Sequence, residues 1–316
     1  MMARLFILLF AWSAFAQDQT TPQMSKANPE DAAPITPLDQ TLVVGTPQDD
    51  TTPDLILIPG IGLSLDAWRS WMEANADRYR MHAVTLPGMA GTAPPPLPDP
   101  PTSDTPFLDN AAAAIAAYIE ANDLDRPIII GHGTGGMVAM LMGIRHPELV
   151  GGVASITMAP AVPVSREPMT QAERAEQAFA FIQPRNASMS EADVSRSIQN
   201  TYLNALPPSE LRDIVLRDAA ACEPHVLTQY WPEVVFTDLI DEIAANESLP
   251  LLLCLPGAGP FRNAQQWHAI ADAADSIMLI EFPGSRSFCH YDNPAQFQLA
   301  LQALIERTER LSAPRD

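Results

Sequence analysis

Short, continuous apolar runs recur along the chain and alternate with segments of helical spacing. Runs such as 55–58 and 128–130 contain no alternating polar positions and are bounded by turn residues, which is typical of strands buried on both faces. The predicted strands are 41–44, 55–58, 81–86, 128–130, 150–157, 249–255 and 277–281. The predicted helices are 68–79, 109–122, 137–145, 264–274 and 295–311. This alternation predicts an α/β fold with a doubly wound, mostly parallel sheet.

One segment interrupts the alternation. Residues 163–242 contain no buried-strand run, and their helical stretches are separated by prolines at 184, 207–208, 224 and 232. We expect this insertion to be a helical cap over the carboxyl ends of the strands, where ligands bind in such sheets. The core is then predicted to comprise residues 41–162 and 243–312.

The first 40 residues have a different composition. Arg4, an apolar run over 5–12 and Ala14-Phe15-Ala16 predict a signal peptide over 1–16, followed by a polar, Pro-rich linker over 17–40. The apolar run is too short to span a bilayer, although an uncleaved anchor is an alternative. We therefore expect a periplasmic or secreted protein with no stable membrane span after cleavage.

The charge, histidine and cysteine content limit the partners, metal sites and disulfides that we expect. With 18 Lys and Arg against 38 Asp and Glu, the formal net charge is −20, which argues against nucleic acid and anionic lipid as partners. The six histidines lack metal-ligand spacing, so no metal or cofactor is predicted. Cys254 lies in a predicted strand, and no disulfide framework is expected, although a Cys222–Cys289 bridge is left open.

The most informative segment is 128–137, where a predicted strand enters a Gly-rich turn and then a helix. This order is that of a nucleophile elbow, G-x-S-x-G, in which a sharp turn presents an attacking side chain above the sheet. The central residue here is Gly133, which has no side chain and cannot attack a substrate.

Four motifs together resemble the α/β-hydrolase superfamily, and exported bacterial members in particular. They are Ile-Pro-Gly at 58–60, Gly-Met-Ala-Gly at 88–91, Gly-His-Gly-Thr-Gly-Gly at 131–136, and a segment from Arg-Ser-Phe to Asp-Asn-Pro at 286–294. The likeness covers about 41–308 and implies a Ser–His–acid triad with a backbone oxyanion hole.

The triad implied by this resemblance is degenerate. Gly133 stands at the nucleophile position, Ser287 at the histidine position seven residues before Pro294, and Gly259 in the turn that usually carries the acid. His290 is the alternative base, if the loop shifts. The resemblance implies that the backbone N–H groups of Ile61 and Thr134 remain as oxyanion donors.

Three functions follow as hypotheses. The first is an exported protein that has lost serine-hydrolase activity and binds a small acyl-type ligand or a protein partner. The second is an active hydrolase of small esters or amides that uses a non-standard site including His290. The third is a protein-interaction module that uses the helical cap.

Overall fold

The computed structural model describes residues 35–312, apart from 48, 50, 99–104, 163–168, 204–205, 207–208 and 259–262. The predicted signal peptide and residues 17–34 of the predicted linker lie outside the described residues.

Seven described strands form one sheet in the order β1-β3-β2-β4-β5-β6-β7. They are β1 (Thr41–Val44), β2 (Leu55–Ile58), β3 (Met81–Val84), β4 (Ile128–His132), β5 (Gly152–Ile156), β6 (Leu251–Pro256) and β7 (Ile277–Phe282). Only β1 pairs antiparallel, with β3, and the other pairs are parallel. The predicted doubly wound α/β fold is confirmed. The chain passes from β3 back across β2 to β4, so the strand order reverses beside β2 and opens a crevice at its carboxyl end.

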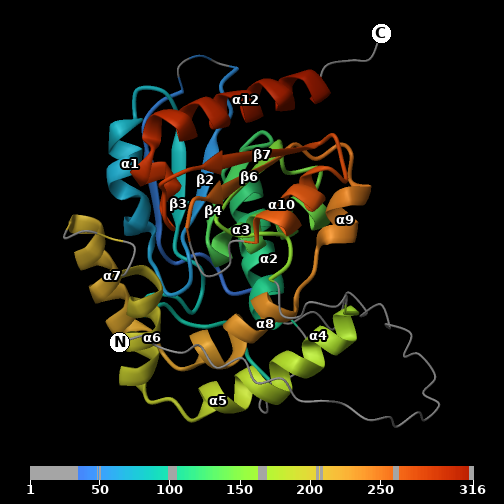
Figure 1. Ribbon diagram of the computed structural model, residues 1–316. Helices are drawn as coiled ribbons and strands as arrows, with labels where there is room; N and C mark the ends of the chain where they lie inside the picture. The colour runs from blue at the N-terminus through green and yellow to red at the C-terminus, as the bar shows by residue number, and fades with distance from the viewer. Residues whose placement is uncertain are drawn as a thin grey trace. The chain divides into compact units, whose positions relative to one another are not determined.

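Helices cover both faces of the sheet (Figure 1). Alternating side chains of the strands belong to two apolar cores, one on each face. Ile56 and Ile58 of β2 pack with α2 (Pro106–Ala121) and α3 (Thr134–Arg145). Leu55 and Leu57 point the other way, toward α1 (Arg69–Ala74) and α12 (Pro294–Ser312). Because both faces are covered, β2 has no need of polar positions, which explains its continuous apolar sequence.

The remaining elements of the core are short. They are the 3₁₀ turn η2 (Leu65–Trp68), α10 (Ala264–Ala271) and α11 (Cys289–Asp292). The helix predicted over 68–79 ends earlier, at Ala74, because the Asn75 side chain donates a hydrogen bond to the carbonyl of Trp71 and stops it there. The three cysteines are free and buried.

The predicted insertion is helical, and its described helices lie between β5 and β6 in the chain. They are α4 (Gln171–Gln177), η3 (Ala178–Ile182), α5 (Gln183–Ala187), α6 (Glu191–Leu203), α7 (Glu210–Ala221), η4 (Val226–Tyr230), α8 (Trp231–Phe236) and α9 (Ile240–Ala245). Among the described helices of the whole chain, none combines the length and the apolar character needed to cross a membrane.

Two of the cap prolines do not separate helices, contrary to the prediction. Pro184 and Pro232 each lie two residues after the end of a π-helical segment, and the chain stays helical through both. A proline inside an α-helix removes a hydrogen bond and clashes with the carbonyl four residues earlier. The wider π turn changes this pairing immediately before the ring, which lets the helix continue. Pro224 does separate α7 from η4, as predicted, and 207–208 lie outside the described residues.

Candidate functional site

Strand β4 enters helix α3 through a single sharply turned residue, Gly133. Its φ is +53° and its ψ is −128°, a backbone conformation that side chains disfavour and that glycine adopts freely. The Gly133 N–H donates to the carbonyl of Ile156 at 2.9 Å, and its carbonyl accepts from the N–H of Gly136 at 2.8 Å. The predicted elbow geometry is therefore present without a side chain at its apex.

The glycines around the apex serve packing. A Cβ on Gly131 would lie 2.1 Å from the carbonyl oxygen of Gly135, and one on Gly135 would lie 2.4 Å from that of Pro59. Neither position tolerates a side chain. A Cβ on Gly133, by contrast, would meet only the Cα of Gly60, at 3.7 Å. The elbow thus leaves open the space into which a nucleophile would project.

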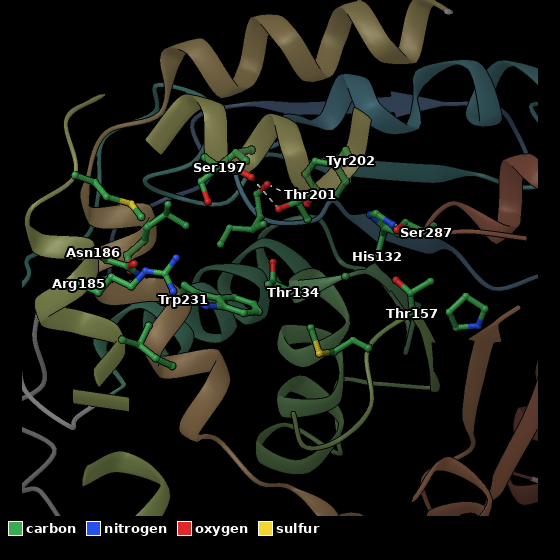
Figure 2. A pocket seen from close by; sticks show the side chains of 18 of the residues that line it. His132, Thr134, Thr157, Arg185, Asn186, Ser197, Thr201, Tyr202, Trp231 and Ser287 are labelled. Atoms are coloured by element: carbon green, nitrogen blue, oxygen red, sulfur yellow. Dashed lines mark hydrogen bonds between the residues drawn. The ribbon is translucent and has the colours of Figure 1, made fainter. Parts of the chain in front are cut away.

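A pocket of about 440 Å³ lies over this apex and beneath the cap (Figure 2). Its floor comes from loops that follow β2, β4, β5, β6 and β7, and its roof comes from η3, α5, α6 and α8. The lining residues are Ile61, His132, Gly133, Thr134, Thr157, Met158, Phe181, Ile182, Arg185, Asn186, Met189, Ser197, Ile198, Thr201, Tyr202, Leu227, Trp231, Pro256, Ala258 and Ser287. This set, within the described chain, contains hydroxyls and one imidazole but no Asp, Glu or Cys.

The imidazole belongs to His132, the residue before the apex. Its Nε2 lies 2.7 Å from the carbonyl oxygen of Ser287, so Nε2 carries the proton and Nδ1 the lone pair. The ring stacks on Phe288 with 4.3 Å between centroids. Burial lowers the pKa of His132 to about 4, because the charged form loses its hydration. His132 is therefore neutral near pH 7 and is a weak base.

Comparison with known proteins places this geometry in a family. The model of a family described as "Alpha/beta hydrolase family" matches residues 55–298, which span the elbow, the cap and the last strand. The chain belongs to the α/β-hydrolase family.

Similarity to individual members is moderate. A pimeloyl-[acyl-carrier protein] methyl ester esterase from Edwardsiella ictaluri is 25% identical over 262 residues, which cover 78% of this chain and 91% of that protein. A hydrolase from Pseudomonas aeruginosa superposes with a TM-score of 0.63 at 18% identity, over 84% of this chain and 93% of that one. A thermophilic esterase from Thermogutta terrifontis gives 0.64 at 14% identity, over 85% and 93%. At these identities the two solved structures support the fold alone.

The other predicted triad positions contribute no acid–base pair among the described residues. Ser287 reaches the pocket wall, where its carbonyl holds His132. His290, the alternative base, is 1% exposed, stacks on Trp68 at 4.5 Å and is not part of the described pocket lining. Burial pushes the pKa of His290 well below its usual range. Gly259 lies outside the described residues.

The two residues predicted as oxyanion donors, Ile61 and Thr134, are both part of the described pocket lining. Neither N–H makes a turn or loop hydrogen bond to a backbone carbonyl among the described residues. The hydroxyl of Tyr202, from α6 of the cap, donates to the Ile61 carbonyl at 3.0 Å and holds that loop in place. The Thr134 hydroxyl is buried and close to that of Tyr230, yet neither reaches hydrogen-bond geometry with any described residue.

Much of the pocket lining was not anticipated from the sequence, including Thr157, Tyr202 and Arg185. Thr157 directly follows β5 and has a φ of +64°, a strained conformation for a β-branched residue. Its position at the carboxyl end of a strand could have drawn attention to it. Tyr202 and Arg185 lie in the cap, and no local pattern indicates that their side chains reach the pocket.

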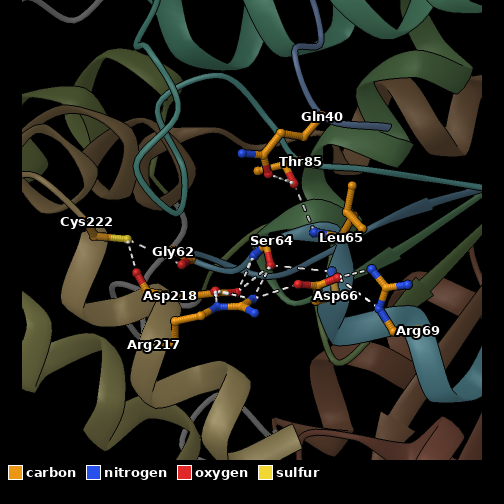
Figure 3. Close-up of polar contacts among 10 residues, drawn as sticks. All are labelled: Gln40, Gly62, Ser64, Leu65, Asp66, Arg69, Thr85, Arg217, Asp218 and Cys222. Atoms are coloured by element: carbon orange, nitrogen blue, oxygen red, sulfur yellow. Dashed lines mark hydrogen bonds and ion pairs between the residues drawn. The ribbon is translucent and has the colours of Figure 1, made fainter. Parts of the chain in front are cut away.

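Buried polar contacts fasten the roof to the core (Figure 3). The carboxylate of Asp218 in α7, 2% exposed, accepts from the N–H of Ser64 at 2.7 Å and from its hydroxyl at 2.6 Å. Arg217 donates to Asp218 and bridges to Asp66 in η2 at 2.8 Å. Because Ser64 follows β2, this cluster ties the cap to the strand that ends at the pocket.

A second buried carboxylate fixes the other side of the cap. Glu233 of α8 is fully buried and accepts hydrogen bonds from the N–H groups of Phe107 and Leu108, at the start of α2. An acid at a helix N-terminus satisfies N–H groups that have no partner within the helix and is favoured by the helix dipole. The roof therefore has a defined position over the elbow.

Proposed function

We propose that this chain is a hydrolase-fold protein that binds an acyl-type ligand in its capped pocket and has lost serine-hydrolase activity. The observation that carries the proposal is the apex itself: Gly133 faces an open pocket with no attacking atom, while the packing around it is retained. Backbone donors at Ile61 and Thr134 support binding of a carbonyl, since they need no particular side chain.

Chemistry at the pocket wall supports the same proposal. The described lining has no carboxylate to orient an imidazole, and its one histidine is neutral and already donates to a backbone carbonyl. A hydroxyl needs an adjacent base to become a nucleophile at neutral pH. Triad members act as a unit, so any residual rate from the remaining donors would be small.

The test combines active-site labelling with turnover. A fluorophosphonate probe and p-nitrophenyl acetate should give no labelling and no turnover above background, while mass spectrometry of the purified protein should detect a bound acyl compound. The double substitution Gly133→Ser and Ser287→His is the comparison variant, because it restores the nucleophile and the histidine that the family resemblance implies at these two positions. Clear labelling of the unaltered chain would contradict the proposal.

An active hydrolase with a non-standard site is the second candidate. It is favoured by the relative from Edwardsiella ictaluri, whose name states an esterase activity, and by His132, whose ring lies beside the apex. In that case His132 would activate a water molecule, since no side chain stands at Gly133. Turnover that disappears in His132→Ala but persists in His290→Ala would support this candidate against the first.

Export is a further part of the proposal. It is supported by the sequence pattern at 1–16, which falls outside the described residues. N-terminal sequencing of protein recovered from a periplasmic fraction should begin at Gln17. A full-length chain found only in the cytoplasm would contradict export and leave the ligand-binding proposal to its own test.

A further inference from the structure

The charge on the pocket wall is opposite in sign to that of the protein. The chain has a net charge of −20, yet the described lining contains no Asp or Glu. Arg185 is the one charged side chain among the described lining residues, given that His132 is neutral. The N-terminus of α3 adds a partial positive charge at Thr134. The described lining therefore carries a local positive charge within an acidic protein, which favours an anionic ligand at that end of the pocket.

The Arg185 guanidinium has no ion-pair partner among the described residues. Other arginines of the cap do have one: Arg196 pairs with Asp193, and Arg217 pairs with Asp66. Figure 2 shows the Arg185 side chain directed into the cavity beside Trp231. A guanidinium can hold a carboxylate through two parallel N–H···O bonds, and here both groups would stay partly in water.

The opposite end of the pocket has different chemistry. Thr134 is 3% exposed, and its hydroxyl points into the cavity with no described hydrogen-bond partner (Figure 2). Ile61 lines the same region, since its neighbour Gly60 lies 3.7 Å from a Cβ built on Gly133, the residue before Thr134. Burying a carboxylate there would cost several kcal/mol of hydration with no full counter-charge. A neutral carbonyl needs only the hydrogen bonds that this end offers.

An apolar wall joins the two ends. Trp231 lies beside Arg185 (Figure 2), and Leu227 lies nearby because its carbonyl accepts a hydrogen bond from Asn186. Met158 packs near Gly136 of the elbow helix, and Ile198 packs near Gly62. Such a surface gains from contact with methylene groups. The order along the pocket is thus cation, apolar wall and neutral hydrogen-bond donors.

We propose that the ligand is a two-headed amphiphile with a free carboxylate on Arg185, an aliphatic middle, and a neutral ester, amide or ketone carbonyl at the elbow. This inference rests on the proposed binding function and specifies its ligand class. The buried end accepts the uncharged head and the solvent-accessible end accepts the charged head, because desolvation penalises the reverse orientation.

The test measures binding of defined probes to the full chain by calorimetry. The probes are monomethyl esters of linear dicarboxylic acids from succinate to sebacate, the corresponding dimethyl esters, and the matching monocarboxylic acids. One half-ester of matching length should bind more tightly than its dimethyl ester and than its monocarboxylic acid. Added salt should weaken the half-ester more than the dimethyl ester.

Two substitutions test the two ends of the ligand one at a time. Arg185→Gln should weaken the half-ester roughly three- to tenfold and leave the dimethyl ester unchanged, as expected for a partly exposed ion pair. Thr134→Val should weaken both esters and leave the monocarboxylic acid unchanged. Arg310→Gln, on α12, changes the net charge equally and should alter none of these affinities. An unchanged melting temperature verifies that each variant is folded.

Several outcomes would overturn the inference: equal affinity for half-ester and dimethyl ester, an equal effect of Arg310→Gln and Arg185→Gln, or no binding across the series. Recovering the probes after each titration separates this inference from the proposed function. Intact ester leaves the non-catalytic proposal standing whatever the affinities are. Hydrolysed ester ends that proposal, while the affinity ratios still decide the ligand class.

Discussion

The Nε2 atom of His132 lies 2.7 Å from the carbonyl oxygen of Ser287, so an elbow histidine contacts the position where the family resemblance implies a catalytic imidazole. The contact uses the backbone of Ser287 and not its side chain. It gives His132 a structural role, since the bond fixes the ring and engages its protonated nitrogen.

Gly133→Ser should give a folded but inactive protein. The new Cβ has room, but the positive φ should lower the free energy of unfolding by about 1–3 kcal/mol. Hydrolysis of p-nitrophenyl acetate should stay at background because the described lining offers only the weakly basic His132, with no carboxylate to orient it. Gly131→Ser is the control and should prevent folding, since its Cβ would lie 2.1 Å from a carbonyl oxygen. Chemical denaturation and the ester assay measure both effects, and equal destabilisation of the two variants would contradict the geometry of the turn.

Acid should destabilise the fold through His132. Burial lowers the pKa of this side chain to about 4, below the ordinary value of about 6.5. Between these two values the unfolded chain binds a proton that the folded chain does not, so stability is present above pH 6.5 and is lost as the pH falls. From pH 7 to pH 5 the loss should be about 2 kcal/mol for this residue. His290 acts in the same direction.

Urea denaturation across that pH range measures this loss. His132→Gln should show a shallower dependence on pH than the unaltered chain. His268→Gln removes a surface imidazole and is the comparison for the substitution itself. A His132→Gln profile parallel to that of the unaltered chain would show that His132 is not the group responsible.

Thr157→Gly should stabilise the protein, unlike most substitutions to glycine. The backbone at this position has a φ of +64°, so removing the β-branched side chain relieves strain worth about 1 kcal/mol after the entropy of glycine is considered. Thr201→Gly, also on the pocket wall but in helix α6, should instead destabilise by about 1 kcal/mol. Thermal unfolding compares the melting temperature of each variant with that of the unaltered chain. A lower melting temperature for both variants would mean that Thr157 is not strained.

Asp218→Ala should loosen the cap. The substitution leaves the buried N–H of Ser64 without its acceptor and removes a partner of Arg217, which should cost about 2–4 kcal/mol. Asp193→Ala is a matched control, because Asp193 contacts Ser190 and Arg196 in a similar way on the surface. The effect of Asp193→Ala should be much smaller. Proteolysis of the cap helices in the folded state measures the loosening. Equal sensitivity of both variants to the protease would show that the contacts of Asp218 do not hold the cap to the core.

Much of the core could be predicted because its strands are buried on both faces. Runs such as 55–58 and 128–130 have a single interpretation when helices alternate with them, and the glycines at 131–136 specify the elbow by their spacing. Helix ends were less accurate, as Asn75 shows, because they depend on one hydrogen bond. The cap prolines were misjudged because a π turn leaves no mark in the sequence pattern.

The candidate site was harder to predict for a different reason. Gly133, Ile61 and Thr134 were found because two motifs fix them at the ends of strands, Ile61 after β2 and the other two after β4. All three line the pocket. Arg185 and Tyr202 enter it from helices far away in the sequence, so their presence depends on how the cap packs. His290 was considered from its distance to Pro294, yet its ring packs against Trp68 in the core. Long-range packing decides these positions, and no local spacing encodes it.

The sharp reversal at Gly133 has an evolutionary consequence. The chain changes direction there through the backbone freedom of glycine, so a side chain at this residue would change reactivity at a cost in stability of about 1–3 kcal/mol. A lineage could acquire or discard an attacking oxygen by exchanging one amino acid, with the surrounding architecture inherited intact.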